Sequence, residues 1–165
     1  MTQDAQARVA EIYRSHAASV FRRARWLLGN EADAREVLQD VFLSLLERPN
    51  QLDGFATIST FLYSMTTHAC LNRLRNQKNR ARLLRERGEM PSEQLPMAAE
   101  ERMRVRHALE RLPAQLAEVA VYYFIDELSH EEIANILGCS RRTVGNLIER
   151  IADWGRSQEV PCLSK

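Results

Sequence analysis

Apolar residues recur at helical spacing in the first part of the chain and predict two amphipathic helices. The first stripe runs from Ile12 to Leu28 and stops at Gly29, a residue that can end a helix without a steric clash. Asn30 is suited to cap the second helix, and Pro49 follows that helix. The apolar face of the second helix consists of Ala34, Val37, Leu38, Val41, Phe42, Leu45 and Leu46. Stripes of this width predict that each helix buries one face.

Periodicity is lost between Asn50 and Ser59, which predicts a loop, and a third helix is predicted to start at Thr60. The far end of this helix is basic, because residues 73–87 contain seven basic residues and one acidic residue. Residues 88–99 combine glycine, proline, serine and acidic residues without a helical stripe. This composition is typical of a flexible linker between domains.

Helical periodicity resumes after the linker, breaks at Pro113 and restarts at Leu116. Two further helix signals then meet across a short turn. Ser129 and Glu132 have the spacing of a capping box, and Gly138 can adopt the left-handed conformation that ends a helix. The next helix has Ser140 as its cap and an apolar stripe formed by Val144, Leu147, Ile148 and Ile151.

The opposite face of this last helix carries donors suited to phosphates and base edges, namely Arg141, Arg142, Asn146 and Arg150. The two helices are therefore interpreted as a DNA-binding helix-turn-helix. A chain of 165 residues has room for two small units. We predict an all-α fold with a first domain at 1–87, a linker at 88–99 and a helix-turn-helix domain at 100–165.

Cysteine and histidine usage argues against an enzyme, a metal site or another cofactor. The three cysteines, Cys70, Cys139 and Cys162, are widely spaced and lack a CxxC pair. The four histidines are dispersed, and no nucleophile elbow, carboxylate cluster or phosphate loop accompanies them. The N-terminus lacks a secretory pattern, and no stretch approaches the roughly twenty apolar residues of a membrane span. We expect a soluble, cytoplasmic protein without membrane insertion.

Four sequence blocks, in order, carry a resemblance to a known family. They are DAREVLQDVFLSLL at 33–46, TFLYSMTTHACLNRLR at 60–75, LERLPAQL at 109–116 and LSHEEIANILGCSRRTV at 128–144. Together they resemble the bacterial RNA polymerase sigma factors of the extracytoplasmic function group, minimal members of the sigma-70 family that keep the second and fourth conserved regions. Several blocks in the right order are more specific than any single block.

The resemblance implies an alternative sigma factor that binds core RNA polymerase, directs it to promoter DNA and helps to melt the minus-ten element. It also implies an anti-sigma factor as a further partner. A stand-alone helix-turn-helix transcriptional regulator is the alternative hypothesis, and polymerase binding discriminates between the two.

The resemblance further implies two surfaces in the first domain. The polymerase-binding residues, which would dock on the clamp helices of the largest subunit, are Val37, Gln39, Asp40, Phe42 and Leu43. The residues for the minus-ten element are Gly54, Phe55, Ala56, Thr57, Ile58, Ser59 and Thr60 in the loop, and His68, Asn72, Arg73 and Lys78 on the third helix. Capturing an unstacked base in the loop would offset a melting cost of a few kcal/mol. In the alternative interpretation, Phe55 fills the domain core and the arginines solvate a helix end.

In the second domain the resemblance implies that the last helix reads the minus-thirty-five element. Its contact residues would be Ser140, Arg141, Arg142, Thr143, Asn146 and Arg150. Two positions depart from the family, since Gly145 stands where most members carry a basic residue and Glu149 places a carboxylate on the same face. Gly145 removes one contact to a phosphate, and the carboxylate of Glu149 adds repulsion from the phosphates. Both changes predict weaker DNA binding whose affinity depends less steeply on salt concentration.

Overall fold

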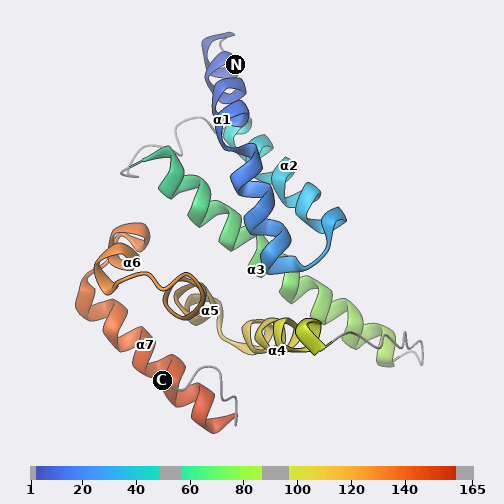
Figure 1. Cartoon of the computed structure of the whole chain (residues 1–165), viewed down its shortest axis with the longest axis vertical. Coiled ribbons are helices and arrows are strands. Elements are labelled where there is room, and N and C mark those ends of the chain that lie inside the picture. Colours follow the sequence, from blue (N-terminus) through green and yellow to red (C-terminus); the bar gives the residue numbers. More distant parts are fainter. Residues whose placement is uncertain (1–2, 49–56, 87–96, 159–165) are drawn as a thin grey trace. The chain divides into compact units, whose positions relative to one another are not determined.

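The computed structural model describes residues 3–48, 57–86 and 97–158 of the chain (Figure 1). Within these residues there are seven α-helices, one π-helical turn and no strand, which confirms the predicted all-α class. The chain divides into two compact units, Met1–Cys70 and Leu71–Lys165. The division falls inside helix α3 (Ile58–Glu86), so this helix contributes to both units. The domain limits at 87 and 100 stay predictions.

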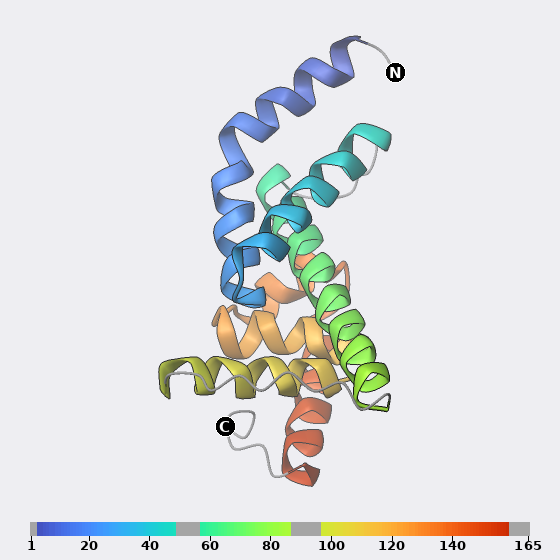
Figure 2. The same ribbon diagram turned by 90° about the vertical axis from the view of Figure 1, so that its right-hand side faces the viewer.

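The first unit is built on α1 (Gln3–Leu28) and α2 (Glu31–Glu47), which runs back along α1 (Figures 1 and 2). Helix α1 begins before the predicted Ile12, and the buried Val9 extends its apolar stripe by one turn. Gly29, at φ 80°, ends α1 in the left-handed conformation, as predicted. The apolar stripes of the two helices are buried against each other, which forms the core of this unit.

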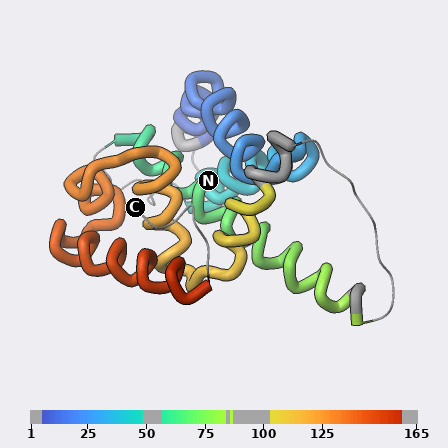
Figure 3. Tube along the Cα trace, turned by 60° about the horizontal axis from the view of Figure 1, so that its bottom comes forward, coloured from blue at the N-terminus to red at the C-terminus, as the bar shows by residue number. Residues whose placement is uncertain are grey.

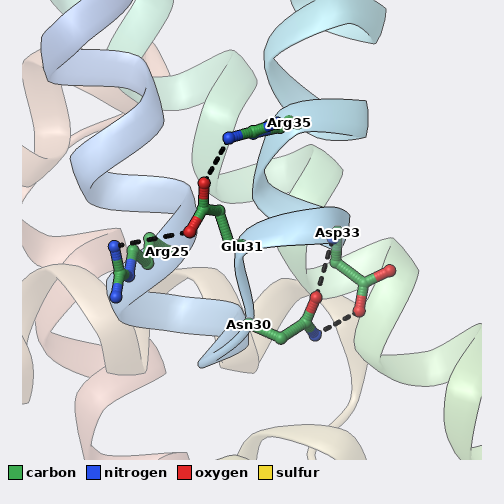
Figure 4. A network of polar contacts seen from close by, with 5 residues as sticks. All are labelled: Arg25, Asn30, Glu31, Asp33 and Arg35. Atoms are coloured by element: carbon green, nitrogen blue, oxygen red, sulfur yellow. Dashed lines mark hydrogen bonds and ion pairs between the residues drawn. The ribbon is translucent and has the colours of Figure 1, made fainter.

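Polar side chains hold the corner between α1 and α2 (Figure 4). Asn30 is the predicted N-cap, and its Oδ1 accepts a hydrogen bond from the backbone N–H of Asp33 at 2.7 Å. Glu31 pairs with Arg35 one turn later, and its Oε2 lies 4.0 Å from Nη1 of Arg25 on α1. Because these ion pairs are exposed, each contributes less than about 1 kcal/mol. The Asn30 cap, at about 1 kcal/mol, is the main local stabilisation of the corner.

Helix α3 begins at Ile58, two residues before the predicted start at Thr60, so Ile58 and Ser59 are helical rather than part of a loop. The cause is a local cap, because Oγ1 of Thr57 accepts a hydrogen bond from the backbone N–H of Thr60 at 3.1 Å. Phe61 follows in the first turn and is buried. Phe61 is therefore a core residue of the first unit.

The second unit contains α4 (Met97–Arg111), α5 (Ala114–Ala120), the π-helical turn η2 (Val121–Ile125), α6 (His130–Leu137) and α7 (Arg141–Ser157). Helix α4 starts at Met97, so residues 97–99, at the end of the predicted linker, are helical. Pro113 separates α4 from α5, as expected. Helices α5 and α6 both pack against α7; in Figure 3 the first two are orange and α7 is red. Of the described helices, none is both long and apolar enough to cross a membrane.

The turn η2 interrupts the helical pattern that restarts at Leu116. The backbone N–H of Asp126 donates to the carbonyl of Val121 at 3.0 Å, a bond across five residues rather than four. Val121 and the neighbouring Tyr122 are both fully buried, and the Tyr122 hydroxyl donates to Oε1 of Glu118 at 2.9 Å. Glu127, at φ 55°, then turns the chain toward α6.

Candidate nucleic-acid and partner-binding surfaces

The start of each helix in the helix-turn-helix is fixed by the predicted caps. Oγ of Ser129 accepts from the backbone N–H of Glu132 at 3.2 Å, and Oε2 of Glu132 accepts from the backbone N–H of Ser129 at 2.8 Å. This reciprocal pair is the predicted capping box. Gly138 ends α6 in the left-handed conformation at φ 63°, and Oγ of Ser140 accepts from the backbone N–H of Thr143 at 3.1 Å. The capping box, the end of α6 at Gly138 and the cap at Ser140 are all confirmed.

Helix α7 presents a sharply divided surface. Val144 and Ile151 are fully buried against the rest of the unit. All six residues predicted to contact the minus-thirty-five element are exposed: Ser140, Arg141, Arg142, Thr143, Asn146 and Arg150. In the described part of the chain, no carboxylate pairs with the three arginines. Their guanidinium groups are therefore available to phosphates and base edges.

Two of the predicted contact residues also hold the helix end. The hydroxyls of Ser140 and Thr143 are hydrogen-bonded to each other at 2.8 Å, beside the cap contact from the Thr143 backbone. Exposed backbone N–H groups and the helix dipole give this end of α7 a partial positive charge that favours a phosphate. Ser140 and Thr143 therefore shape the N-terminal end of the surface that is predicted to contact DNA.

The two departures from the family lie on the same side of α7. A Cβ atom built at Gly145 would meet no heavy atom within 4 Å, so the missing side chain is not required by packing. Glu149 lies one turn later and is exposed. Neither position is constrained by the packing of the core.

The predicted polymerase-binding residues on α2 separate into two groups. Val37 and Phe42 are only 1% and 5% exposed, so their side chains lie in the core of the first unit, and their contact with a partner stays a prediction. Gln39 and Asp40 are exposed, and Leu43 is 55% exposed. Of the five predicted residues, Gln39, Asp40 and Leu43 are therefore the exposed ones, and these three are called the outward surface of α2 below.

Tyr13 on α1 extends this surface and was not predicted. Its ring packs edge-on against Phe42, with centroids 4.8 Å apart and an interplanar angle of 70°, yet Tyr13 is 46% exposed. The signal in the sequence was an aromatic residue directly after the buried Ile12, which places it at the margin of the apolar stripe.

The predicted minus-ten residues are only partly described. Gly54, Phe55 and Ala56 lie outside the described residues, and Thr57, Ile58, Ser59 and Thr60 form the start of α3. Farther along α3, His68, Asn72 and Lys78 are exposed and Arg73 is half-buried. Oδ1 of Asn72 accepts from Nη1 of Arg75 at 3.1 Å, and Nζ of Lys78 donates to the backbone oxygen of Glu110 at 3.4 Å. The helix thus offers a mixed polar and basic surface.

A pocket of about 190 Å³ lies between α1 and α3 in the first unit. It was not predicted, because its walls come from residues far apart in the sequence. They are His16, Ser19, Val20, Arg23, Ser59, Leu62, Tyr63 and Thr66. Ser59, one of the predicted minus-ten residues, lies at its edge.

Comparison with known proteins assigns both halves of the chain. The Sigma-70 region 2 family matches residues 12–80, and the Sigma-70 region 4 family matches residues 102–152. The first match contains the outward surface of α2, and the second contains α6 and most of α7, as far as Ala152.

Individual relatives agree with this assignment. The ECF RNA polymerase sigma factor SigE of Mycolicibacterium smegmatis is 28% identical over 165 residues, covering 94% of this chain and 61% of that protein. The ECF RNA polymerase sigma factor SigW of Bacillus subtilis is 26% identical over 171 residues, covering 94% of this chain and 89% of that protein. The chain thus spans less than two thirds of SigE but most of SigW.

A solved structure shares the fold. It is described as CnrH in complex with the cytosolic domain of CnrY, with a TM-score of 0.51, 23% sequence identity, and coverage of 88% of this chain and 82% of that chain. The two family matches occur in the expected order, and the relatives that match most of this chain carry the same family name. The chain therefore belongs to the sigma-70 family, in its extracytoplasmic function group.

Proposed function

We propose that this protein is an alternative sigma factor that binds core RNA polymerase, directs it to specific promoters and helps to melt the minus-ten element. The observation that carries the proposal is the presence of both sigma regions, in order, in one short chain. A stand-alone regulator needs a helix-turn-helix but has no need of a region 2. The proposed sigma function, unlike that of a stand-alone regulator, therefore requires both region 2 and region 4.

Polymerase docks on the outward surface of α2. Asp40 offers a charged acceptor, Gln39 an amide and Leu43 an apolar anchor, a combination that suits the side of a partner helix. The partner is the pair of clamp helices of the largest polymerase subunit. Burial of Val37 and Phe42 supports this assignment indirectly, since both side chains hold α2 rigidly in place.

Promoter recognition combines two DNA contacts. The exposed arginines of α7 bind the minus-thirty-five element as duplex, through phosphates and base edges. The segment before α3 captures an unstacked base of the minus-ten element, and α3 holds the neighbouring backbone. Melting is driven by this binding, so the protein needs no catalytic residue and no cofactor.

An anti-sigma factor is the remaining partner in the proposal, acting in the cytoplasm by occupying surfaces that polymerase needs. Support comes from the family and from the related fold of CnrH, which was solved in complex with the cytosolic domain of CnrY. An anti-sigma factor that covers Leu43 would compete directly with polymerase for the same apolar anchor.

Co-elution with core RNA polymerase on gel filtration tests the proposal. The wild-type protein is expected to co-elute, and the double variant Asp40→Arg, Leu43→Ala is expected to elute separately. Both positions are exposed, so the folded state should survive, unlike in a variant of the buried Phe42. Glu11→Arg on α1 is the matched control, because it makes the same charge reversal at an exposed site away from α2.

Two outcomes contradict the proposal. Clean separation of the folded wild-type protein from polymerase at micromolar concentration would favour the stand-alone regulator. The second test is permanganate probing of promoter DNA, which detects strand opening. Opening of the minus-ten element should require this protein and core polymerase together. Equal opening with polymerase alone would remove the role in melting.

A further inference from the structure

Glu149 is an acidic residue in the middle of a basic DNA-facing surface, and no basic residue on its own helix compensates it. The positions one turn away are Gly145 and Asn146 on one side and Ala152 and Asp153 on the other. In the described part of the chain, Glu149 forms no ion pair. Its carboxylate is therefore exposed and free to meet a ligand.

The position of the carboxylate follows from helix geometry. Long side chains on an α-helix lean toward the N-terminal end and cover the preceding turn. For Glu149 the preceding turn carries Gly145, where a Cβ would meet nothing within 4 Å. The carboxylate can thus lie over bare backbone, beside Asn146 and toward the end of α7 that carries Arg142. This is the part of a recognition helix that contacts base edges.

The chemistry of the groove restricts what such a carboxylate can bind. An ionised carboxylate only accepts hydrogen bonds, and phosphates repel it. In the major groove the exocyclic amino groups of cytosine and adenine are the base-edge donors, and a carboxylate is the usual partner of cytosine N4. Building on the proposed sigma function, we infer that Glu149 reads a cytosine in the minus-thirty-five element and that Gly145 leaves the space for its side chain.

Selection from a promoter library with randomised minus-thirty-five positions tests this inference. The reconstituted holoenzyme is used, and the enriched sequences of the wild type, Glu149→Gln and Glu149→Ala are compared. The wild type should prefer cytosine at one position by about 5- to 150-fold, the discrimination expected of one base contact. Both variants should lose that preference and keep the preferences at other positions.

Asp153→Asn is the matched control, because it removes one negative charge one turn farther along α7. It should leave the base preference at every position unchanged. If Glu149→Gln also leaves it unchanged and raises affinity equally for all sequences, Glu149 acts only by repulsion and the inference is wrong. A lost preference for adenine would overturn the cytosine assignment. A wild-type chain that forms no holoenzyme would instead refute the sigma function itself.

Discussion

Arg23 on α1 donates two hydrogen bonds to the hydroxyl oxygen of Thr67 on α3, at 2.9 Å from Nε and 2.8 Å from Nη2. The same guanidinium lies over the ring of Tyr63, with its central carbon 3.7 Å from the ring centroid. The Thr67 hydroxyl in turn donates to the backbone oxygen of Tyr63 at 2.9 Å. A polar contact therefore joins α1 and α3 inside the first unit, next to the apolar core.

The contact between Arg23 and Thr67 predicts that Thr67→Val destabilises the first unit more than Thr66→Val does. Thr67→Val keeps the shape of the side chain and removes the acceptor of a charged donor, which should lower the free energy of unfolding of the first unit by about 2 kcal/mol. Thr66→Val is the control, because Thr66 is equally buried but its hydroxyl bonds only to the carbonyl of Leu62 in the same helix. It should cost no more than about 1 kcal/mol.

Tryptophan fluorescence can report on the units separately. The two tryptophans are Trp26 on α1 and Trp154 on α7. Urea unfolding in a Trp154→Phe background therefore follows the first unit alone. Equal destabilisation by Thr67→Val and Thr66→Val would show that the Arg23 contact contributes nothing beyond the burial of a hydroxyl.

The Ser140 cap predicts a coupled loss of stability and DNA affinity. Ser140→Ala leaves the backbone N–H of Thr143 without its acceptor, which should cost about 1 kcal/mol of helix stability. The first turn of α7, which carries Arg141 and Arg142, should fray and bind duplex DNA more weakly. Ser157→Ala, at the far end of the same helix, is the control. Unchanged promoter binding by the Ser140→Ala holoenzyme would contradict a role for the capped end.

Local interactions explain which parts of the fold were predictable. The caps at Asn30, Ser129 and Ser140 were found residue by residue, because each joins residues three apart in the sequence. The contact between Arg23 and Thr67 was not found, because it joins residues 44 apart. Hydrophobic periodicity says that a helix has a buried face, and it does not say which polar groups meet across that face.

The α2 surface shows how two kinds of sequence argument differ at the candidate site. Hydrophobic periodicity already places Val37 and Phe42 on the apolar face of α2 and leaves Leu43 off it. The structure agrees, since the packing of α1 against α2 buries Val37 and Phe42 and leaves Leu43 exposed, whereas the family resemblance grouped all three as polymerase-binding residues. The π-helical turn at Val121–Ile125 was also unpredictable, because a shift of backbone hydrogen bonds has no side-chain signature in the sequence.

The capping box predicts a pH dependence in the second unit. The backbone N–H of Ser129, and then its hydroxyl, bond to the Glu132 carboxylate and lower the pKa of Glu132 from 4.5. A lowered folded-state pKa means that the stabilisation is complete above pH 4.5 and is lost as the pH falls through the lowered value. Glu132→Gln should therefore melt below the wild type at pH 7, and the two melting temperatures should converge in acid.

Melting followed by Trp154 fluorescence in a Trp26→Phe background measures this difference. Glu131→Gln is the control, because it removes an exposed acid from the same turn of α6 without touching the hydrogen bonds of Ser129. A constant gap between wild type and Glu132→Gln from pH 7 down to pH 3 would contradict the capping-box explanation.

Burial predicts different reactivity for two cysteines. Cys70 is fully buried, and burial raises the pKa of its thiol to about 12, although Arg23 opposes the shift. At pH 8 only about one molecule in ten thousand then carries the reactive thiolate. Cys139, in the turn before α7, is half-exposed. In a Cys162→Ser background, Ellman's reagent should react with one thiol in the native protein and with two in urea.

Replacing Cys139 by serine in that background should abolish the reaction of the native protein. Fast labelling of Cys70 without denaturant would mean that α3 opens away from α1 in solution, and would argue against the tight Arg23 contact.

The missing basic residue at Gly145 predicts a gain of function. Gly145→Arg fits the open space and replaces the poorest ordinary helix former, so α7 should gain up to about 1 kcal/mol of stability. The new guanidinium should add one phosphate contact, which steepens the slope of log K against log salt for duplex DNA by about 0.9. Gly145→Ala is the control that gains helix stability without charge. Equal salt slopes for both variants would show that position 145 does not face DNA.

Glu149 should limit the gain in DNA affinity from Gly145→Arg, because it lies four residues after position 145 and can pair with the new guanidinium. An exposed pair in this order is weak, at a few tenths of a kcal/mol, so a phosphate should still compete for the arginine. Adding Glu149→Gln to Gly145→Arg should therefore raise affinity for duplex DNA further while erasing the preference for cytosine. Salt titrations of the single and double variants on matched and mismatched duplexes separate the two effects. An increase in affinity that keeps the cytosine preference would leave Glu149 with repulsion as its only role.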